Sequence, residues 1–338
     1  MLRSKKVIKF SLLIIFVFIS CTTIYGIHVY IQARKSFSQS YRQTKFHNNY
    51  ILKKKPFTIL LLGIDTGSFG RIDKGNSDTM LIAAINPKEK KSSLVSIPRD
   101  TAAQIIGTKD FNMQKINAAY NIGGSSMATN TVASLLNIPV NYYLTINMGS
   151  LEKIVNSIGG IDITVPFSFQ DPYTGDQKFI RGKTHMNGSM ALAYVRMRHA
   201  DPEGDYGRQK RQQQVIKAIY QKAISVDSVG KLVPLVDSIS KGMTTNISFK
   251  DMETLFLSAR ILSKNVTTDH LQGTNAWIGD GAYQIASDQE LQRVSNELRK
   301  TLNLPKESLK NEEVYQNAQN KGFVFNANYD QNYTIFQH

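Results

Sequence analysis

Short apolar runs separated by polar turns dominate the chain from residue 56 onward. The run at 57–64 is continuous, which is typical of a strand buried on both faces of a sheet, and 79–87 and 93–100 indicate two more strands, each stopped by a proline-containing turn. Later segments carry apolar residues at helical spacing and end at glycines or polar turns. The pattern predicts further strands at 140–146 and 161–166, helices at 125–138, 149–160, 207–223, 229–241, 249–263 and 287–302, and a helix running into a short strand over 186–195.

Strands that alternate with helices predict an α/β domain over residues 56–302, with a mixed central β-sheet and helices on both faces. After Leu304 the chain becomes polar and rich in asparagine and glutamine. Few apolar side chains are available there to form a core. Residues 303–338 are therefore expected to form a polar, mobile tail.

A long apolar run near the start predicts a transmembrane helix. Residues 10–31 contain no charged side chain, and at ~1.5 Å per residue they span about 33 Å, enough for the ~30 Å hydrocarbon core of a bilayer. The basic stub 1–9 favours a cytoplasmic N-terminus, which puts residues 32–55, a basic juxtamembrane linker, and the α/β domain outside the cell. A cleaved signal peptide is the alternative, but no A-x-A cleavage site follows the run.

The chain is basic, with 41 Lys and Arg against 26 Asp and Glu and a formal net charge of +15. This excess favours a polyanionic partner: nucleic acid, anionic lipid or a phosphorylated polymer. Cys21 is the only cysteine, so an intrachain disulfide and a cysteine metal site are excluded. The six histidines lack zinc-site spacing, and no phosphate-binding glycine loop of the P-loop type occurs.

The densest group of charged residues lies between Tyr194 and Gln214. In an extended segment, Arg196 and Arg198 would point to the same side. Asp205 is placed to cap the helix that follows, and Arg208 and Gln212 share one face of that helix. Arginines near a helix N-terminus suit a phosphate, because the guanidinium fork grips its oxygens and the helix dipole favours an anion. The alternative is an ordinary solvated charged loop.

Three further residues lie where strands are expected to begin or end. Asp65 follows the first strand and Asp78 opens the second, so their carboxylates could hold Mg²⁺, completed by substrate phosphates and water. A turn-capping role is the alternative for both. Arg99 follows the third strand, where it could bind the same anion or pair with an acid such as Asp100.

Taken in order, these segments resemble the LytR-CpsA-Psr family of cell-wall attachment proteins, found mainly in Gram-positive bacteria. The resemblance covers residues 57–220 and is expected to continue to about 302. It rests on LLLGID, SDTM, SIPRD, KINAAY, GGIDITVP and YVRMRHADPEGDYGRQKRQQQ.

The resemblance implies a membrane-bound phosphotransferase with an extracellular catalytic domain. Such proteins transfer a glycan polymer, such as wall teichoic acid or capsule, from a polyprenyl-pyrophosphate carrier to peptidoglycan. The product is a phosphodiester at the C6 hydroxyl of N-acetylmuramic acid. By the same resemblance, Asp65 and Asp78 would hold Mg²⁺, with Mn²⁺ as an alternative. Catalysis and pyrophosphate binding would fall to Arg99, Arg196, Arg198, Arg208 and Gln212, with Asp205 ordering the arginines.

Two other functions use the same residues. A polyprenyl-pyrophosphate hydrolase would need the same phosphate grip with water as the nucleophile, and a non-enzymatic protein could bind anionic polymers or act in regulation. Nucleic acid is not the expected ligand, because the domain is predicted to lie outside the cell. Asn76 stands where the family often has arginine before SDT, which puts in doubt the role of that loop.

Overall fold

The centre of the molecule is a six-stranded mixed β-sheet. The computed structural model describes residues 25–43, 49–66, 75–170, 177–197, 201–225, 240, 242–262, 265–327 and 329–337. In spatial order the strands are β11 (Met243–Thr245), β6 (Tyr142–Asn147), β1 (Phe57–Ile64), β2 (Ser77–Asn86), β3 (Lys91–Ser96) and β12 (Val266–His270).

Strand directions bring the ends of four strands to one edge of this sheet. β1 is parallel to β6, β3 is parallel to β12, and β2 runs antiparallel to β1 and β3. Ile64, Ser96, Asn147 and His270 therefore end their strands at the edge where Ser77 begins β2. We call this the carboxyl edge, and open α/β sheets bind ligands at such an edge.

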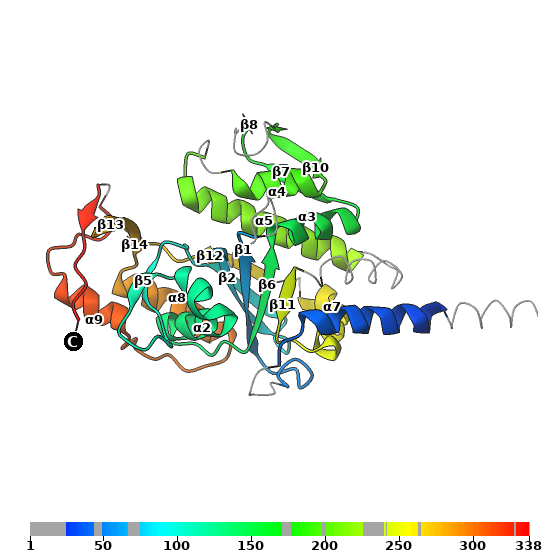
Figure 1. Cartoon of the computed structure of the whole chain (residues 1–338), viewed down its shortest axis with the longest axis horizontal. Coiled ribbons are helices and arrows are strands. Elements are labelled where there is room, and N and C mark those ends of the chain that lie inside the picture. Colours follow the sequence, from blue (N-terminus) through cyan, green and yellow to red (C-terminus); the bar gives the residue numbers. More distant parts are fainter. Residues whose placement is uncertain are drawn as a thin grey trace, which may run out of the picture.

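Helices cover both faces of the sheet (Figure 1), which confirms the predicted layers. α2 (Ala118–Leu136) and α8 (Asp288–Thr301) pack on one face, and α7 (Phe249–Leu262) packs on the other. β1 explains why the sequence shows a continuous apolar run. Its Leu60 and Leu62 belong to the core under α2 and α8, whereas Phe57 and Ile59 belong to the core under α7.

Residues 25–40 form a helix that lies beside α7 (Figure 1). Val29, Ala33 and Phe37 are buried on one side of it, and the Phe37 ring meets the Phe249 ring edge-on at 5.5 Å. The first part of the predicted linker at 32–55 is thus helical and packed. The sequence did not indicate this helix, because its few apolar residues are spread among polar neighbours. Most of the predicted span at 10–31 falls on residues 1–24, outside the described part. Within the described part, no helix has the length and apolar character needed to cross a membrane.

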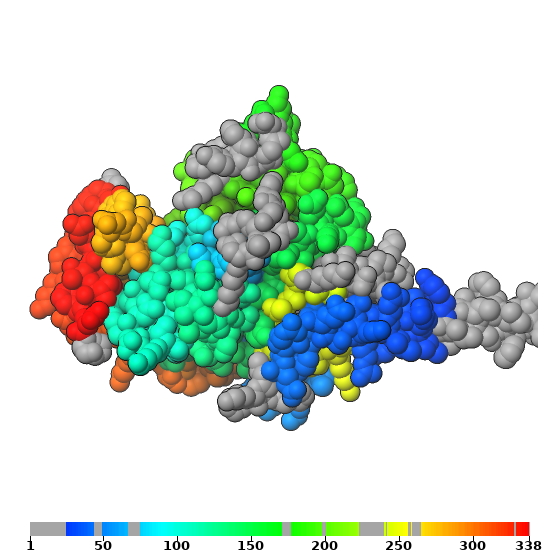
Figure 2. All heavy atoms as spheres, viewed as in Figure 1, coloured from blue at the N-terminus to red at the C-terminus, as the bar shows by residue number. Residues whose placement is uncertain are grey.

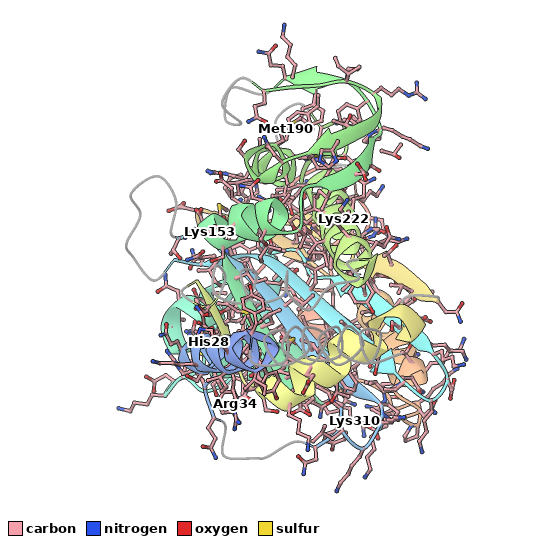
Figure 3. The ribbon with its side chains drawn as sticks, turned by 90° about the vertical axis from the view of Figure 1, so that its right-hand side faces the viewer. His28, Arg34, Lys153, Met190, Lys222 and Lys310 are labelled. Atoms are coloured by element: carbon pink, nitrogen blue, oxygen red, sulfur yellow. The ribbon has the colours of Figure 1, made fainter. Side chains whose placement is uncertain are left out.

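A second group of elements has its own apolar core and lies beyond the carboxyl edge (Figure 1). In Figure 3, Lys153, Met190 and Lys222 mark its three helices. The group consists of α3 (Met148–Ser157), β7 (Ile161–Val165), β8 (Phe169–Gln170), β9 (Lys178–Phe179), β10 (Gly182–Met186), α4 (Gly188–Arg196) and α5 (Gly204–Ser225).

The C-terminal residues fold against the domain, so the mobile tail predicted for 303–338 is wrong over its described part (Figure 2). Polar side chains that suggested disorder are used here to bind main chain: Gln316 bonds both the N–H and the carbonyl of Phe336. The buried Tyr333 hydroxyl donates to Asn317 over 2.7 Å. The remaining elements are β4 (Ala102–Gln104), β5 (Met113–Lys115), β13 (Thr274–Ile278), β14 (Gly281–Ile285), α9 (Glu312–Gln319) and β15 (Gln331–Asn332).

Candidate anion site at the carboxyl edge

Arg99 lies at the carboxyl edge, in the turn that follows β3. Its Nη1 is 2.9 Å from Asp78 Oδ1 and its Nε is 3.5 Å from Asp100 Oδ2. Burial acts to lower the pKa of Arg99, but the carboxylates of Asp78, Asp100 and Asp205 outweigh it, so the pKa is raised. Arg99 is therefore a permanent cation held in a fixed position, as binding an anion requires.

Asp205 and Arg208 form an ion pair in the first turn of α5, with Arg208 Nη2 2.5 Å from Asp205 Oδ1. Gln209 also donates to Asp205, over 3.0 Å. Asp205 lies inside the first turn, where a carboxylate is stabilised by the helix dipole. Arg208 and Gln212 are both nearly buried, one turn apart on α5. Because the Asp205 carboxylate also raises the pKa of Arg99, the Asp205–Arg208 pair lies near Arg99, which the family resemblance alone had joined to this group.

Arg196 is the last residue of α4, so the extended conformation predicted for it is wrong. Asn187 caps this helix through a side-chain bond to the Met190 N–H, and the helix continues through Arg196. Chain extension begins only at Met197. The Arg196 side chain is partly buried at this helix end. Arg198 lies outside the described residues.

The turn between α4 and α5 is held by a buried ion pair that the sequence reading missed. Arg211 is 2% exposed and pairs with the Asp201 carboxylate. Its Nε donates to the Tyr194 carbonyl over 3.0 Å, and its Nη2 donates to the Met197 carbonyl. Gly207 is required beside it, because a Cβ there would collide with the Asp201 carboxylate. The predicted turn at 201–204 is confirmed, since the Gly204 N–H bonds the Asp201 carbonyl.

Asp65 and Asp78 approach the same edge from neighbouring strands. The Asp65 N–H donates to the Asn76 carbonyl over 3.3 Å, so Asp65 lies opposite the entry to β2. Asn76, which replaces the family's frequent arginine, accepts a hydrogen bond from Asn121. Among the described residues, no group of three or more Asp, Glu, His or Cys could hold a metal. Two carboxylates suit Mg²⁺ only when phosphate oxygens and water complete its shell.

Side chains along α5 tie this helix to three strands. Gln213 Nε2 donates to Ser96 Oγ at the end of β3 and to the Asp269 carbonyl in β12. The Tyr206 hydroxyl accepts from the Gly273 N–H over 2.8 Å and lies 3.2 Å from Gln284 Oε1. These contacts were not predicted. The one signal in the sequence is that Gln209 and Gln213, four residues apart, lie on the same face of the predicted helix. These contacts fix Arg208 relative to Arg99.

Comparison with known proteins identifies one family by both sequence and structure. A model of the LytR_cpsA_psr family matches residues 23–300. The polyisoprenyl-teichoic acid–peptidoglycan teichoic acid transferase TagU of Enterococcus faecalis is 40% identical over 307 residues, which cover 90% of this chain and 99% of that protein.

Solved structures have the same fold. Protein gbs0355 of Streptococcus agalactiae superposes with a TM-score of 0.72 and 35% identity, covering 82% of this chain and 100% of that one. A structure of TagT bound to LIIa-WTA gives a TM-score of 0.64 and 30% identity over 78% of this chain and 95% of that one.

Proposed function

This chain belongs to the LytR_cpsA_psr family, and we propose that it transfers a glycan polymer such as wall teichoic acid or capsule from a polyprenyl-pyrophosphate carrier to peptidoglycan. The relative in Enterococcus faecalis is named a teichoic acid transferase with peptidoglycan as acceptor. The TagT structure, which has the same fold, is bound to LIIa-WTA. Both support a glycopolymer donor for this chain.

One structural observation carries the proposal: two arginine–aspartate pairs from distant parts of the chain meet at the carboxyl edge. Arg99 pairs with Asp78, and Arg208 pairs with Asp205. The charge of Asp205 also raises the pKa of Arg99. Fixed guanidinium groups in a partly buried site can bind a pyrophosphate through charge-assisted hydrogen bonds. Arg196, Arg198 and Gln212 would complete the set.

In the proposed reaction, the C6 hydroxyl of N-acetylmuramic acid attacks the phosphorus that carries the glycan. A new P–O bond forms to the acceptor, the P–O bond to the carrier breaks, and polyprenyl phosphate leaves. The hydroxyl proton is released. Phosphoryl transfer depends mainly on positioning and charge stabilisation. Arg99 and Arg208 would stabilise the negative charge on the transferring and leaving phosphates, so a protein nucleophile is not required.

Asp65 and Asp78 are the residues that would hold Mg²⁺ or Mn²⁺ against the pyrophosphate. The bound ion would supply charge stabilisation to the phosphate oxygens. Because Asp78 already accepts a hydrogen bond from Arg99, this carboxylate would link the cation site to the arginine site. Both parts would then act on the same pyrophosphate.

We also propose that residues 10–31 anchor the protein in the cell membrane, with residues 1–9 in the cytoplasm and the catalytic domain outside. The basic residues before the apolar run support this orientation. A lipid-linked donor and a wall-linked acceptor both occur at that surface.

The test uses the full chain in detergent micelles with Mg²⁺, a synthetic polyprenyl-pyrophosphoryl saccharide and peptidoglycan oligomers. We expect the saccharide phosphate to become covalently attached to the oligomer, as detected by mass spectrometry. Release of free saccharide phosphate without attachment would instead identify a hydrolase. Binding of the donor without either product would identify a non-enzymatic binding protein.

A further inference from the structure

A cleft of about 410 Å³ lies beside the anion site, between the first turn of α5 and the β13–β14 hairpin. Asp100 and Asp205 form part of its wall, and the charges of both carboxylates raise the pKa of Arg99. The cleft is thus a direct neighbour of the proposed reaction centre, on the side of the C-terminal elements. Nothing in the transfer chemistry described above uses it.

The hairpin that forms the far wall is held firmly in place. The Gln284 N–H donates to the Asp100 carbonyl over 2.9 Å, one residue after Arg99. The Tyr206 hydroxyl joins the start of α5 to Gly273 and Gln284. The Trp277 Nε1–H donates to Asp330 over 3.1 Å. The cleft is therefore a preformed feature, with walls from four separate parts of the chain.

Charge distinguishes this cleft from the anion site. Its lining contains four carboxylates, those of Asp100, Glu203, Asp205 and Asp330, and neither lysine nor arginine. Three of these carboxylates are paired with cations just outside the lining, Asp100 with Lys115, Glu203 with Lys210 and Asp205 with Arg208, so the cleft offers carboxylate oxygens at its surface and no lysine or arginine to a phosphate. An uncharged ligand with hydroxyl and amide hydrogens would instead find hydrogen-bond acceptors.

Two other features indicate a saccharide. Trp277 is 40% exposed, and it shares the outward face of β13 with Asn275. An aromatic ring beside polar side chains offers both the apolar surface and the hydrogen bonds that a sugar ring can use. Gln209, only 5% exposed, lines the cleft, and its Oε1 has no hydrogen-bond partner among the described residues. A buried acceptor of this kind is suited to a ligand donor.

We propose that this cleft binds the acceptor: the uncharged N-acetylated amino sugars of a peptidoglycan glycan strand. The assignment rests on the proposed transfer function, because it names the partner that enters next to the pyrophosphate. The donor would bind beside Arg99 and Arg208, and the acceptor would bind in the cleft, with Asp205 between the two. The polyanionic donor would not fill the acceptor site, because the lining of the cleft contains no lysine or arginine to bind its phosphates.

Binding is tested directly with a tetramer of N-acetylglucosamine as the probe. Trp277 is the only tryptophan of the chain, so its fluorescence reports on the cleft without a label. With the full chain in detergent micelles, we expect a saturable fluorescence change with the tetramer and none with a glycerol phosphate oligomer. A saturable change with the phosphate oligomer alone would overturn the proposal.

Variants connect this binding to the reaction. Asn275→Ala is expected to weaken tetramer binding about tenfold, equivalent to ~1.4 kcal/mol. Trp277→Ala should raise the KM for peptidoglycan oligomers about tenfold and leave the KM for the donor unchanged. Tyr315→Ala, which alters an exposed aromatic side chain on α9, is the matched control and should match the unaltered chain. Circular dichroism checks that all variants fold.

The outcomes separate this proposal from the transfer function. Transfer with an unchanged acceptor KM in Trp277→Ala would overturn the acceptor site and leave the transfer function standing. Saturable tetramer binding that Asn275→Ala weakens, in a chain that forms no transfer product, would support the saccharide site and overturn the transfer function.

Discussion

The guanidinium group of Arg99 donates to the carboxylate of Asp78 over 2.9 Å, joining the turn after β3 to the start of β2. Both side chains are about one-fifth exposed. A phosphate that enters the site meets a guanidinium already fixed in orientation, so little conformational entropy is lost on binding.

Replacing Arg99 should therefore damage catalysis more than folding. We expect Arg99→Ala to lower kcat for transfer by about a hundredfold to a thousandfold, the usual effect of losing one fixed donor to a developing charge. Arg99→Lys should recover only part of the loss, because an ammonium group lacks the planar fork. Arg181→Ala, at an exposed arginine beyond the carboxyl edge, is the control. Equal activity in Arg99→Ala and Arg181→Ala would contradict the site assignment.

Neighbouring residues on α5 should differ sharply in their effect on stability. Arg211→Ala leaves the buried Asp201 carboxylate without its cation, so we expect a loss of about 3–5 kcal/mol in the free energy of unfolding. Lys210 pairs with Glu203, but both side chains are more than half exposed. Lys210→Ala should cost less than about 1 kcal/mol. Urea titration followed by circular dichroism measures both free energies of unfolding. Similar losses would show that the buried Arg211–Asp201 pair stabilises the fold no more than an exposed pair does.

Glu313 gives the domain a pH-dependent stability. Burial raises the pKa of this carboxyl from 4.5 to about 7, although the Gln104 N–H acts to lower it. The folded state thus holds the proton more tightly than the unfolded state. Its contribution to stability is complete below pH 4.5 and is lost as the pH rises through about 7.

Glu313→Gln should remove this dependence, because the amide cannot ionise and keeps an acceptor for Gln104. We expect the variant to gain about 3 kcal/mol over the unaltered chain between pH 5 and pH 8, from ~1.4 kcal/mol per pKa unit. Urea titrations of both proteins across that range provide the difference. A constant difference would mean that Glu313 does not titrate in this window.

Metal dependence tests the two carboxylates at the carboxyl edge. EDTA should abolish transfer, and added Mg²⁺ or Mn²⁺ should restore it. Asp65→Asn should raise the Mg²⁺ concentration for half-maximal activity at least about tenfold. Asp162→Asn, at an exposed aspartate on β7, should leave it unchanged. Full activity in EDTA would remove the proposed role of Asp65 and Asp78.

Much of the central domain could be predicted from the sequence because its signals are local. The continuous apolar run of β1 results from burial on both faces, and α7 and α8 follow the predicted helices closely. The charged residues around α5 could be recognised as a group because they lie close together in the sequence. Asp65, Asp78 and Arg99, in contrast, could be joined to that group only through the family resemblance, since their meeting depends on strand order.

The errors arose where polar residues are used for structure. Arg211 resembles any surface arginine in the sequence, and only the fold reveals Asp201 beside it. β13 alternates buried and exposed positions and contains few large apolar residues, so it was not predicted. The asparagines and glutamines after residue 310 suggested a mobile tail, yet several bond main-chain groups within the fold.

The contact between Phe37 and Phe249 has a consequence for how the enzyme would stand on the cell surface. Residues 25–31, the end of the proposed anchor, belong to the same helix as Phe37, and that helix packs on α7. The catalytic domain would then continue rigidly from its anchor. Its height and tilt above the bilayer would be set by side-chain packing, so that the carboxyl edge meets both the lipid carrier and the wall at a constant angle.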